Sequence, residues 1–578
     1  MDVSRGDLAR RGFADTERSS RFLAAPELDF LDREVLLEAL SQTAEPDLAL
    51  LALLRLVEAG GTIGPEDSSW MSALRILGGS RYWGDQLIAR PALLSDLAAD
   101  PFEEHFSTVY RRIADSLRPI LDDPRGFGDA VVHLRRTYRR EMLGIVSQDL
   151  DDSAADRESA ERTMPFAGRS IANLVGATLE GALMIARYRH PEAAGVPFAI
   201  IAMGKTGAEE LNYISDVDVI YVCEGGDAAV EAATLLATTV TRIVSEVAPE
   251  PPLWPLDANL RPEGKDGPLV RTLDSHVHYY KRWAKTWEFQ ALLKARPVAG
   301  DENLGHRYVE ALAPMVWTAV ERENFVEDSQ EMRRRVEAHV RAREAERQLK
   351  LGPGGLRDVE FTVQLLQLVH GRTDESLRAR NTLDALAALA HGGYVGRDDA
   401  AELASCYAFL RALEHRIQLD RMRRSHVVPT KPEELQRLSR LLGVDDIDRE
   451  WARTRRRVRE LHEAIFYRPL LPLTAQLSAS EVALSGEAAT ARLQAIGYVD
   501  PAGAMRHIAA LTDGLTRRAA IQRQLLPVML GWLAQGPRPD TGLLEFRRFS
   551  EQLGTTHWYL KLLRDNGAVA ERLATILA

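Results

Sequence analysis

The segment Phe198–Val222, FAIIAMGKTGAEELNYISDVDVIYV, constrains the fold of this chain more than any other stretch. Its pattern predicts a strand, a glycine-containing turn, a short helix and a second strand that opens with Asp216 and Asp218. Side chains two residues apart in a strand project to the same face, so the two carboxylates are expected side by side. The chain is therefore predicted to contain a sheet with paired acids at the head of one strand.

These paired acids have two possible explanations. In the simpler one, Asp216 and Asp218 begin a strand and are merely solvated there. The rest of that strand is apolar, however, which predicts a central strand, and adjacent carboxylates at its head are costly without a cation. The turn Gly204–Gly207 upstream also has backbone N–H groups that could face a phosphate. Together these features favour a functional site.

The same segment resembles the polymerase-β-type nucleotidyltransferases, which share its apolar-Gly turn, connecting segment and Asp-apolar-Asp-apolar strand. This resemblance predicts an α+β, predominantly helical fold with a small mixed sheet embedded between helical bundles. Asp257, in WPLDANLRP on a third predicted strand, is the best candidate for a third carboxylate. Mg²⁺ prefers oxygen ligands and is bound through a few carboxylates together with substrate phosphates. A site for Mg²⁺ is therefore expected on Asp216, Asp218 and Asp257.

Three polar residues near these acids have open roles. Arg261 could reach a phosphate or pair with one of the aspartates. Ser215 could bind a phosphate oxygen or a metal-bound water, or its hydroxyl could bond nearby backbone in a turn. Lys205 could neutralise phosphate charge or be solvated.

Composition limits the class of protein. A net charge of −11 argues against nonspecific nucleic-acid binding, which depends on Lys and Arg side chains. Cys223 and Cys406 lack a metal-binding spacing, which fits a reducing compartment. The first residues lack the apolar core of a signal peptide, and no apolar run is long enough to span a bilayer. The expectation is a cytoplasmic protein with no nucleic-acid and no membrane partner.

A chain of 578 residues is expected to form several domains. Four regions are predicted: an N-terminal helical region (1–160), a nucleotidyltransferase core (161–310), a helical bundle (311–470), and a linker with a further helical region (471–578). Within them we expect a loop over residues 151–162, a helix from about Ala167 to Tyr188 and a hairpin turn at Gly264–Gly267. The basic clusters at 135–140 and 421–424 are expected to be solvated, although one arginine of the first could reach a neighbouring site and the second could be a partner site.

Four sequence blocks resemble, in the same order, those of the glutamine synthetase adenylyltransferase/adenylyl-removing family: GKTGAEELNYISDVDVIYV, LDANLRPEGKDGPLV, KRWAKTWEFQALLKARPVAGD and LKLGPGGLRDVEFTVQLLQLVHG. That family joins two nucleotidyltransferase units, of which the first removes AMP from a tyrosine of glutamine synthetase and the second attaches it. Glu210-Leu211-Asn212 and the run Gly354–Phe361 resemble the first, adenylyl-removing half. The chain is therefore expected to be that half plus a connecting helical region of a longer protein, or a single-copy member.

The resemblance assigns Mg²⁺ to the three aspartates and nucleotide binding to a second set of residues: Gly204, Lys205, Gly207, Ser215, Arg261, Glu288, Lys294, Arg296 and Arg357. An alternative for the residues near Trp287 is a surface helix whose tryptophan packs inward. Gly352–Gly355 before a helix could offer an anion cradle. Asp358 and Glu360 either complement the dipole of that helix or take part in the chemistry.

The sequence departs from the family pattern at two places. Thr206 and Ala208 stand where the family usually has Leu and Gly, although both glycines of the turn proper remain. Asn259 stands where the family usually has Arg, which removes one phosphate contact but leaves the acids intact.

The function implied by the resemblance is Mg²⁺-dependent phosphorolysis of the AMP–tyrosine bond of adenylylated glutamine synthetase. Inorganic phosphate would enter, ADP would leave, and a PII-type signalling protein is an expected partner. The first alternative is the forward reaction, adenylyl transfer from ATP to a protein tyrosine, because the same carboxylates serve both directions. The second is a non-catalytic regulatory module that binds a PII protein. A nucleic-acid polymerase or tRNA nucleotidyltransferase is disfavoured by the acidic balance.

Overall fold

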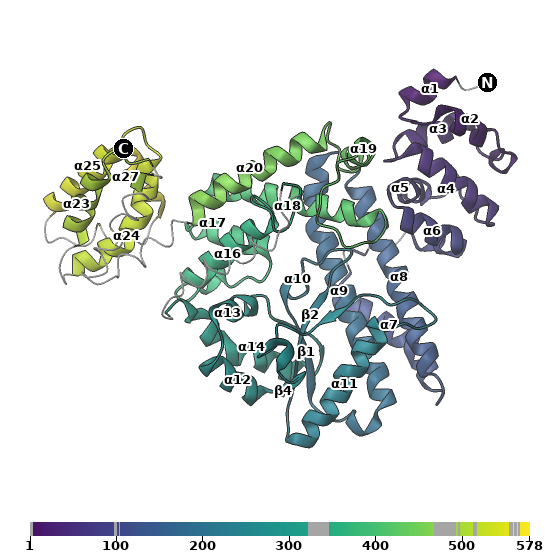
Figure 1. Cartoon of the computed structure of the whole chain (residues 1–578), viewed down its shortest axis with the longest axis horizontal. Helices are drawn as coiled ribbons and strands as arrows, with labels where there is room; N and C mark the ends of the chain where they lie inside the picture. The colour runs from purple at the N-terminus through teal and green to yellow at the C-terminus, as the bar shows by residue number, and fades with distance from the viewer. Residues whose placement is uncertain are drawn as a thin grey trace.

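A five-stranded mixed sheet lies among helices in the computed structural model (Figure 1). Its strands are β1 (Phe198–Ala202), β2 (Val217–Cys223), β3 (Leu256–Asp257), β4 (Val270–Thr272) and β5 (Arg296–Gly300). The structure describes residues 4–97, 101–102, 104–321, 346–466, 493–494, 497–512, 517–553, 559, 563 and 567–578. The predicted fold class, a mainly helical protein with a small mixed sheet, is confirmed.

Strand β2 holds the sheet together. It pairs antiparallel with β1 and parallel with both β3 and β4, and β1 also pairs antiparallel with β5. The hairpin predicted at Gly264–Gly267 is therefore wrong, because β3 and β4 pair with β2 and not with each other. Between them lies a loop with a short 3₁₀ turn, Gly264–Asp266, whose carbonyl groups are gathered by the Arg261 guanidinium.

The two faces of the sheet are covered by different helices. Phe198, Ile200 and Ala202 of β1 pack in one core with α9 (Arg157–Arg189) and α11 (Asp227–Ser245). Ala199 and Ile201, which alternate with them, pack in a second core with α12 (Leu273–Arg282) and α14 (Glu302–Trp317). By length and composition α11 is apolar enough to cross a membrane, but in this fold its buried residues line the first core. Both faces of β1 are thus dry, as expected for a central strand.

The other helices form groups before and after the sheet. Those before it are α1 (Arg5–Arg10), α2 (Thr16–Leu23), α3 (Arg33–Ser41), α4 (Pro46–Glu58), α5 (Trp70–Gly79), α6 (Arg81–Ala89), α7 (Phe106–Leu121) and α8 (Phe127–Asp152). Within and after it are α10 (Gly204–Gly207), α13 (Thr286–Leu292), α16 (Leu356–His370), α17 (Thr382–His391), α18 (Arg397–Leu419), α19 (Pro432–Leu441) and α20 (Ile447–Phe466). Helices α23 (Pro501–Thr512), α24 (Arg517–Ala534), α25 (Pro539–Gln552) and α27 (Gly567–Leu577) share a core of their own. The linker predicted at 471–486 lies outside the described residues, and the division into four regions stays a prediction.

The loop predicted over residues 151–162 is mostly helix. Helix α8 continues to Asp152, and α9 begins at Arg157, ten residues before the predicted start at Ala167. The acidic residues there are helix-start signals: the Asp156 side chain accepts a hydrogen bond from the Ser159 N–H, 2.8 Å away. The predicted boundary at 160 consequently falls within the first turn of α9.

The basic cluster on α8 is not simply a solvated face. Arg135 is buried and donates to the carbonyl groups of Ile243 (2.9 Å), Glu246 (2.7 Å) and Glu250 (2.6 Å). Carbonyl groups at the end of a helix lack partners within the helix, and here Arg135 supplies them for α11. The prediction was wrong because a helix end far along the chain leaves no mark on the local pattern of α8.

A buried ion pair fastens α8 to α18. The Arg416 guanidinium donates to both carboxylate oxygens of Asp149, at 2.6 and 2.9 Å, and the Tyr213 hydroxyl donates to the same carboxylate at 2.5 Å. Burial acts to raise the pKa of Asp149, but Arg416 holds that pKa below its ordinary value. Both charges are sealed from water, so each depends on the other.

Replacement of Arg416 by Met is expected to lower the free energy of unfolding by about 3–5 kcal/mol, because it leaves a buried carboxylate unpaired. Urea unfolding followed by circular dichroism at pH 7 measures this change. Arg397→Met, on the exposed start of the same helix, is the matched control. Adding Asp149→Asn to Arg416→Met should recover part of the loss, and a loss no larger than that of the control would contradict the assignment.

Candidate active site

A cleft of about 400 Å³ opens where the sheet meets the helical bundle. Its lining comes from β2, β3, α10, α13, α16 and five connecting segments: Gly204, Lys205, Ser215, Asp216, Asp218, Asp257, Leu260, Trp287, Gln290, Ala291, Lys294, Lys350, Arg357, Glu360, Phe361, Gln364 and Arg424. All three predicted acids lie in it, with five of the nine predicted nucleotide-binding residues.

Strand register brings the acids together. Parallel pairing of β2 with β3 places Asp218 opposite Asp257, and Asp216 directly precedes β2. Burial, followed by the charges of Asp257 and Asp216, raises the pKa of Asp218 to about 6. The crowding of negative charge that the sequence predicted is thus present as an electrostatic cost on Asp218.

The turn at α10 packs against these acids. We call Asp216, Asp218 and Asp257 together the acid wall. Gly204 has a φ of +53°, and a Cβ placed on it would lie 2.6 Å from Asp218 Oδ2, so glycine is required there. Gly207 does not line the cleft; a Cβ on it would collide with the Lys294 carbonyl, so this glycine permits close packing. The predicted turn is confirmed as a single helical turn.

The acid wall suits a divalent cation. Three carboxylates line one cleft, and burial, followed by the charges of the other two, raises the pKa of Asp218. Within the described ranges, no group of three His, Cys, Asp or Glu side chains is close enough together to hold one metal ion. Asp216 is instead paired with the Arg424 guanidinium, and Asp257 accepts a hydrogen bond from the Asn259 N–H at 2.7 Å. The residues that could hold Mg²⁺ are therefore Asp216, Asp218 and Asp257.

Lys205, Lys294, Lys350 and Arg357 also line the cleft, and we call these four side chains the cationic wall. Lys205 Nζ lies 2.9 Å from the buried Glu414 carboxylate, and Lys294 Nζ lies 3.0 Å from Glu210. Burial, and then the neighbouring Arg411, lower the pKa of Lys205 to about 7. Each lysine is thus held at a fixed place by an acid that belongs to another element.

Glu360 stands inside this cationic wall. Burial acts to raise its pKa, but Lys294, Arg357, Lys205 and Lys350 bring that pKa down to about 2. One carboxylate oxygen lies 3.5 Å from Arg357, and the other is buried and makes no hydrogen bond within the described residues. The Glu360 side chain is therefore an ionised acceptor that faces the cleft.

The loop Gly352–Gly355 is not arranged as the predicted anion cradle. The Gly354 N–H donates to Asp358 Oδ2 at 2.8 Å, and the Gly355 N–H donates to the Gly352 carbonyl at 2.9 Å. Asp358 therefore stabilises the start of α16. This is the structural role, one of the two roles expected for it. Arg357, in the same turn, does line the cleft.

Three further predicted ligands hold the scaffold. Glu288 accepts from the Lys285 N–H at 2.9 Å and caps α13. Arg296 donates to the carbonyls of Gly207 (3.2 Å) and Thr206 (3.1 Å), which fixes the α10 turn. Arg261 donates to carbonyls of the 258–268 loop, and within the described residues it forms no ion pair with an aspartate. All three charged side chains thus bind groups of the scaffold, and their predicted contacts with a nucleotide stay predictions.

Other lining residues were not predicted. Arg424 belongs to a cluster expected to be solvated; its side chain is indeed 53% exposed, but it also pairs with Asp216. Lys350 lies in one of the blocks that carried the resemblance, which is the signal that could have found it. Gln290 Nε2 donates to Gln364 Oε1 at 2.7 Å, so the far end of the cleft presents amides beside Trp287.

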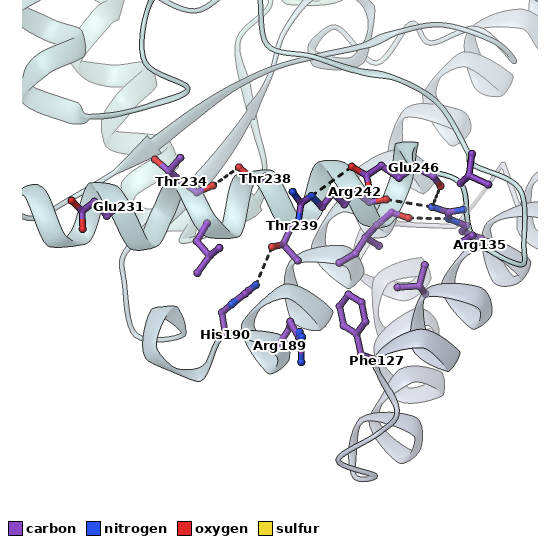
Figure 2. A pocket seen from close by; sticks show the side chains of 15 residues that line it. Phe127, Arg135, Arg189, His190, Glu231, Thr234, Thr238, Thr239, Arg242 and Glu246 are labelled. Atoms are coloured by element: carbon purple, nitrogen blue, oxygen red, sulfur yellow. Dashed lines mark hydrogen bonds and ion pairs between the residues drawn. The ribbon is translucent and has the colours of Figure 1, made fainter.

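A larger cavity of about 640 Å³ lies between α8, α9 and α11 (Figure 2). Threonines and the aliphatic parts of α11 line it, and the Arg135 guanidinium at its edge is occupied by carbonyl groups. Its acids, Glu231 and Glu246, stand at different ends of the drawn wall. Paired carboxylates face the smaller cleft, which we therefore take as the candidate active site.

The chain is similar to two protein-family models and to several known proteins. A family model described as glutamate-ammonia ligase adenylyltransferase matches residues 70–311, and one described as GlnD PII-uridylyltransferase matches residues 328–466. Bifunctional glutamine synthetase adenylyltransferase/adenylyl-removing enzymes are similar along nearly the whole chain. The protein from Streptomyces avermitilis is 53% identical over 99% of this chain and 58% of its own length. Those from Leifsonia xyli subsp. xyli and Bifidobacterium longum are 47% and 41% identical over 94% and 99% of this chain, each over 57% of its own length. The chain thus spans less than two thirds of these relatives.

Asp218→Asn is expected to raise the free energy of unfolding at pH 8 without divalent ions by on the order of 1–3 kcal/mol. The folded-state pKa of about 6 lies above the ordinary value of 3.8, so the charged form costs stability above pH 6. This cost fades as the pH falls towards the unfolded value. Urea unfolding in EDTA should show a gain at pH 8 that falls to about one third of that size at pH 4.5. Asp266→Asn, on an exposed loop, is the control, and an equal gain at both pH values would contradict the analysis.

Proposed function

The chain is a homologue of the bifunctional glutamine synthetase adenylyltransferase/adenylyl-removing enzymes, and we propose that it removes AMP from adenylylated glutamine synthetase. The observation that carries this proposal is a single cleft that three carboxylates line together with lysine and arginine side chains. Such a cleft suits a phosphodiester flanked by metal-binding acids and phosphate-binding cations.

In the proposed reaction, an oxygen of inorganic phosphate bonds to the α-phosphorus of the AMP–tyrosine diester. The bond from that phosphorus to the tyrosine oxygen breaks, its electron pair stays on the tyrosine, and ADP leaves. A phenol has a pKa of about 10, so the departing oxygen needs charge stabilisation more than a strong acid. Phosphate is already ionised at neutral pH and needs positioning more than a dedicated base.

The side chains divide this work between the two walls. Asp216, Asp218 and Asp257 would hold Mg²⁺, which when bound neutralises charge on phosphate oxygens. Lys205 and Lys294 of the cationic wall are held by buried acids and would bind phosphate oxygens in fixed positions. Gly204 and Ser215 border the acid wall, where they would orient the nucleotide phosphates.

Lys350 and Arg357 add two cations for the phosphate that enters. Glu360 stays ionised beside them and would accept a hydrogen bond from a hydroxyl or amine of the substrate. At the amide end of the cleft, Trp287 and Phe361 offer aromatic surface for a nucleobase.

The protein partners and the compartment are also proposals. Adenylylated glutamine synthetase is the proposed substrate, because the names of the relatives specify that enzyme. The match of residues 328–466 to a PII-uridylyltransferase model supports a PII-type signalling protein as the partner of the helical bundle. Both cysteines are free and buried, in keeping with the reducing cytoplasm.

The forward reaction is the second candidate, because the relatives carry both activities in their names and the same acids serve both directions. Two assays separate the candidates. In one, the chain is incubated with adenylylated glutamine synthetase and phosphate, and ADP is measured; in the other, it is incubated with unmodified synthetase and labelled ATP. Release of ADP without label transfer supports removal, whereas label transfer alone would overturn it. Binding of a PII protein with neither activity would instead support the non-catalytic alternative.

Asp216→Asn is expected to lower phosphate-dependent ADP release by about 100-fold or more, because it removes one charge from the acid wall. The rate is measured with adenylylated synthetase, and circular dichroism checks that the fold is kept. Asp266→Asn removes an equal charge outside the cleft and should leave the rate unchanged. Full activity in the Asp216 variant would refute the site.

Removal of divalent ions is expected to stop the reaction. Dialysis against EDTA should reduce ADP release to the background rate, and added MgCl₂ should restore it. The charge repulsion among the acids makes a cation necessary for phosphate oxygens to approach them. Undiminished turnover in excess EDTA would exclude this mechanism.

A further inference from the structure

The acid wall receives one cation from far along the chain. Arg424 lies on residues 420–427, a segment between α18 and Val428 that we call the strap. Its Nη1 atom pairs with Asp216 Oδ2, and both side chains line the cleft. Arg424 is therefore a residue of the site that the helical bundle supplies.

The beginning of the strap is fixed to the N-terminal helices. The Ser80 hydroxyl donates to the Leu419 carbonyl at 2.6 Å, and the Tyr82 N–H donates to the Asp420 carbonyl at 3.0 Å. The Arg81 guanidinium donates to the Asp420 carboxylate at 2.6 Å. Three consecutive residues at the start of α6 thus hold this end.

The other end of the strap is fixed to the cationic wall. The Leu349 N–H donates to the His426 carbonyl at 2.7 Å. The His426 ring lies 2.7 Å from Glu414, the buried acid that also holds Lys205. Movement at this end would therefore disturb a lysine of the cleft.

The middle of the strap is strained. Met422 has a φ of +47°, in the left-handed region that a residue with a Cβ adopts at a cost. Its side chain packs against the main hydrophobic core, which holds the backbone in this conformation. Arg424, two residues further on, is consequently directed to Asp216 by a constrained backbone rather than by a free loop.

We propose that Arg424 competes with divalent cations for the Asp216 carboxylate and so sets the cation concentration at which the acid wall fills. This inference rests on the proposed function only in taking the aspartates as the cation site. A guanidinium and a divalent cation repel each other, so Asp216 binds one at the expense of the other. The Arg424 side chain is 53% exposed, which keeps the ion pair weak enough to be displaced.

Titration of the metal-free chain with MgCl₂ in an isothermal calorimeter tests this competition. Arg424→Ala should tighten Mg²⁺ binding by up to about fivefold, the range that an exposed ion pair allows. Arg424→Lys keeps the charge and should lie between Arg424→Ala and the unchanged chain. Arg423→Ala removes a neighbouring exposed charge of the strap and should leave the dissociation constant unchanged. Asp216→Asn should weaken Mg²⁺ binding and abolish the effect of Arg424→Ala.

Unchanged or weaker Mg²⁺ binding by Arg424→Ala would overturn the proposal, as would equal tightening by Arg423→Ala. Absence of Mg²⁺ binding by all variants, or binding that Asp216→Asn does not affect, would overturn it together with the metal assignment. The expected order of affinities without ADP release from adenylylated synthetase would refute the proposed function alone. The readout is metal affinity, so it does not depend on turnover.

Discussion

Repulsion among carboxylates is the constraint around which this structure is arranged. Parallel pairing of β2 and β3 sets Asp218 beside Asp257, and Asp216 stands one residue before the strand. Burial and these neighbours raise the pKa of Asp218 to about 6, so the charged wall is unfavourable by itself. Lys350 and Arg424, from other parts of the chain, oppose this rise, and a bound cation would reduce the cost that remains on Asp218.

Buried charges also join the sheet to the helical bundle. Glu210, just after the α10 turn, binds Lys294 of the sheet side and Thr382 of α17. Arg411 of α18 donates to the Glu210 carbonyl at 2.5 Å and also to Asn212. Since each of these groups is sealed from water, separating the bundle from the sheet would leave several of them unpaired. The cleft therefore depends on both units, because residues of the sheet region and of the helical bundle line it together.

Local pattern was sufficient to predict β1, β2, the α10 turn and the two acids of β2, because alternation and glycine turns are short-range features. Asp257 was found because it lies on a third predicted strand, and it is the last residue of the short strand β3. The partners of Arg424 and Arg135 were not predicted, because they lie far away in the sequence and do not affect the helical periodicity around either arginine. Arg261, Glu288 and Arg296 bind groups of the scaffold, mainly of the backbone, and their roles in nucleotide binding stay predictions. The hairpin failed for a related reason, because two segments paired with a common third strand.

Helix α9 links the cleft to helices that lie outside the strand-rich segment. Its Gly168 carbonyl accepts a hydrogen bond from Leu211 beside the active-site turn, while Gly176 and Gly181 admit Phe106 and Ile113 of α7. The same rod therefore forms part of the sheet's cover and of the N-terminal helical core. A fragment that kept only the strands would lose this support, so we expect it to be unable to form the cleft without α9 and the helices packed on it.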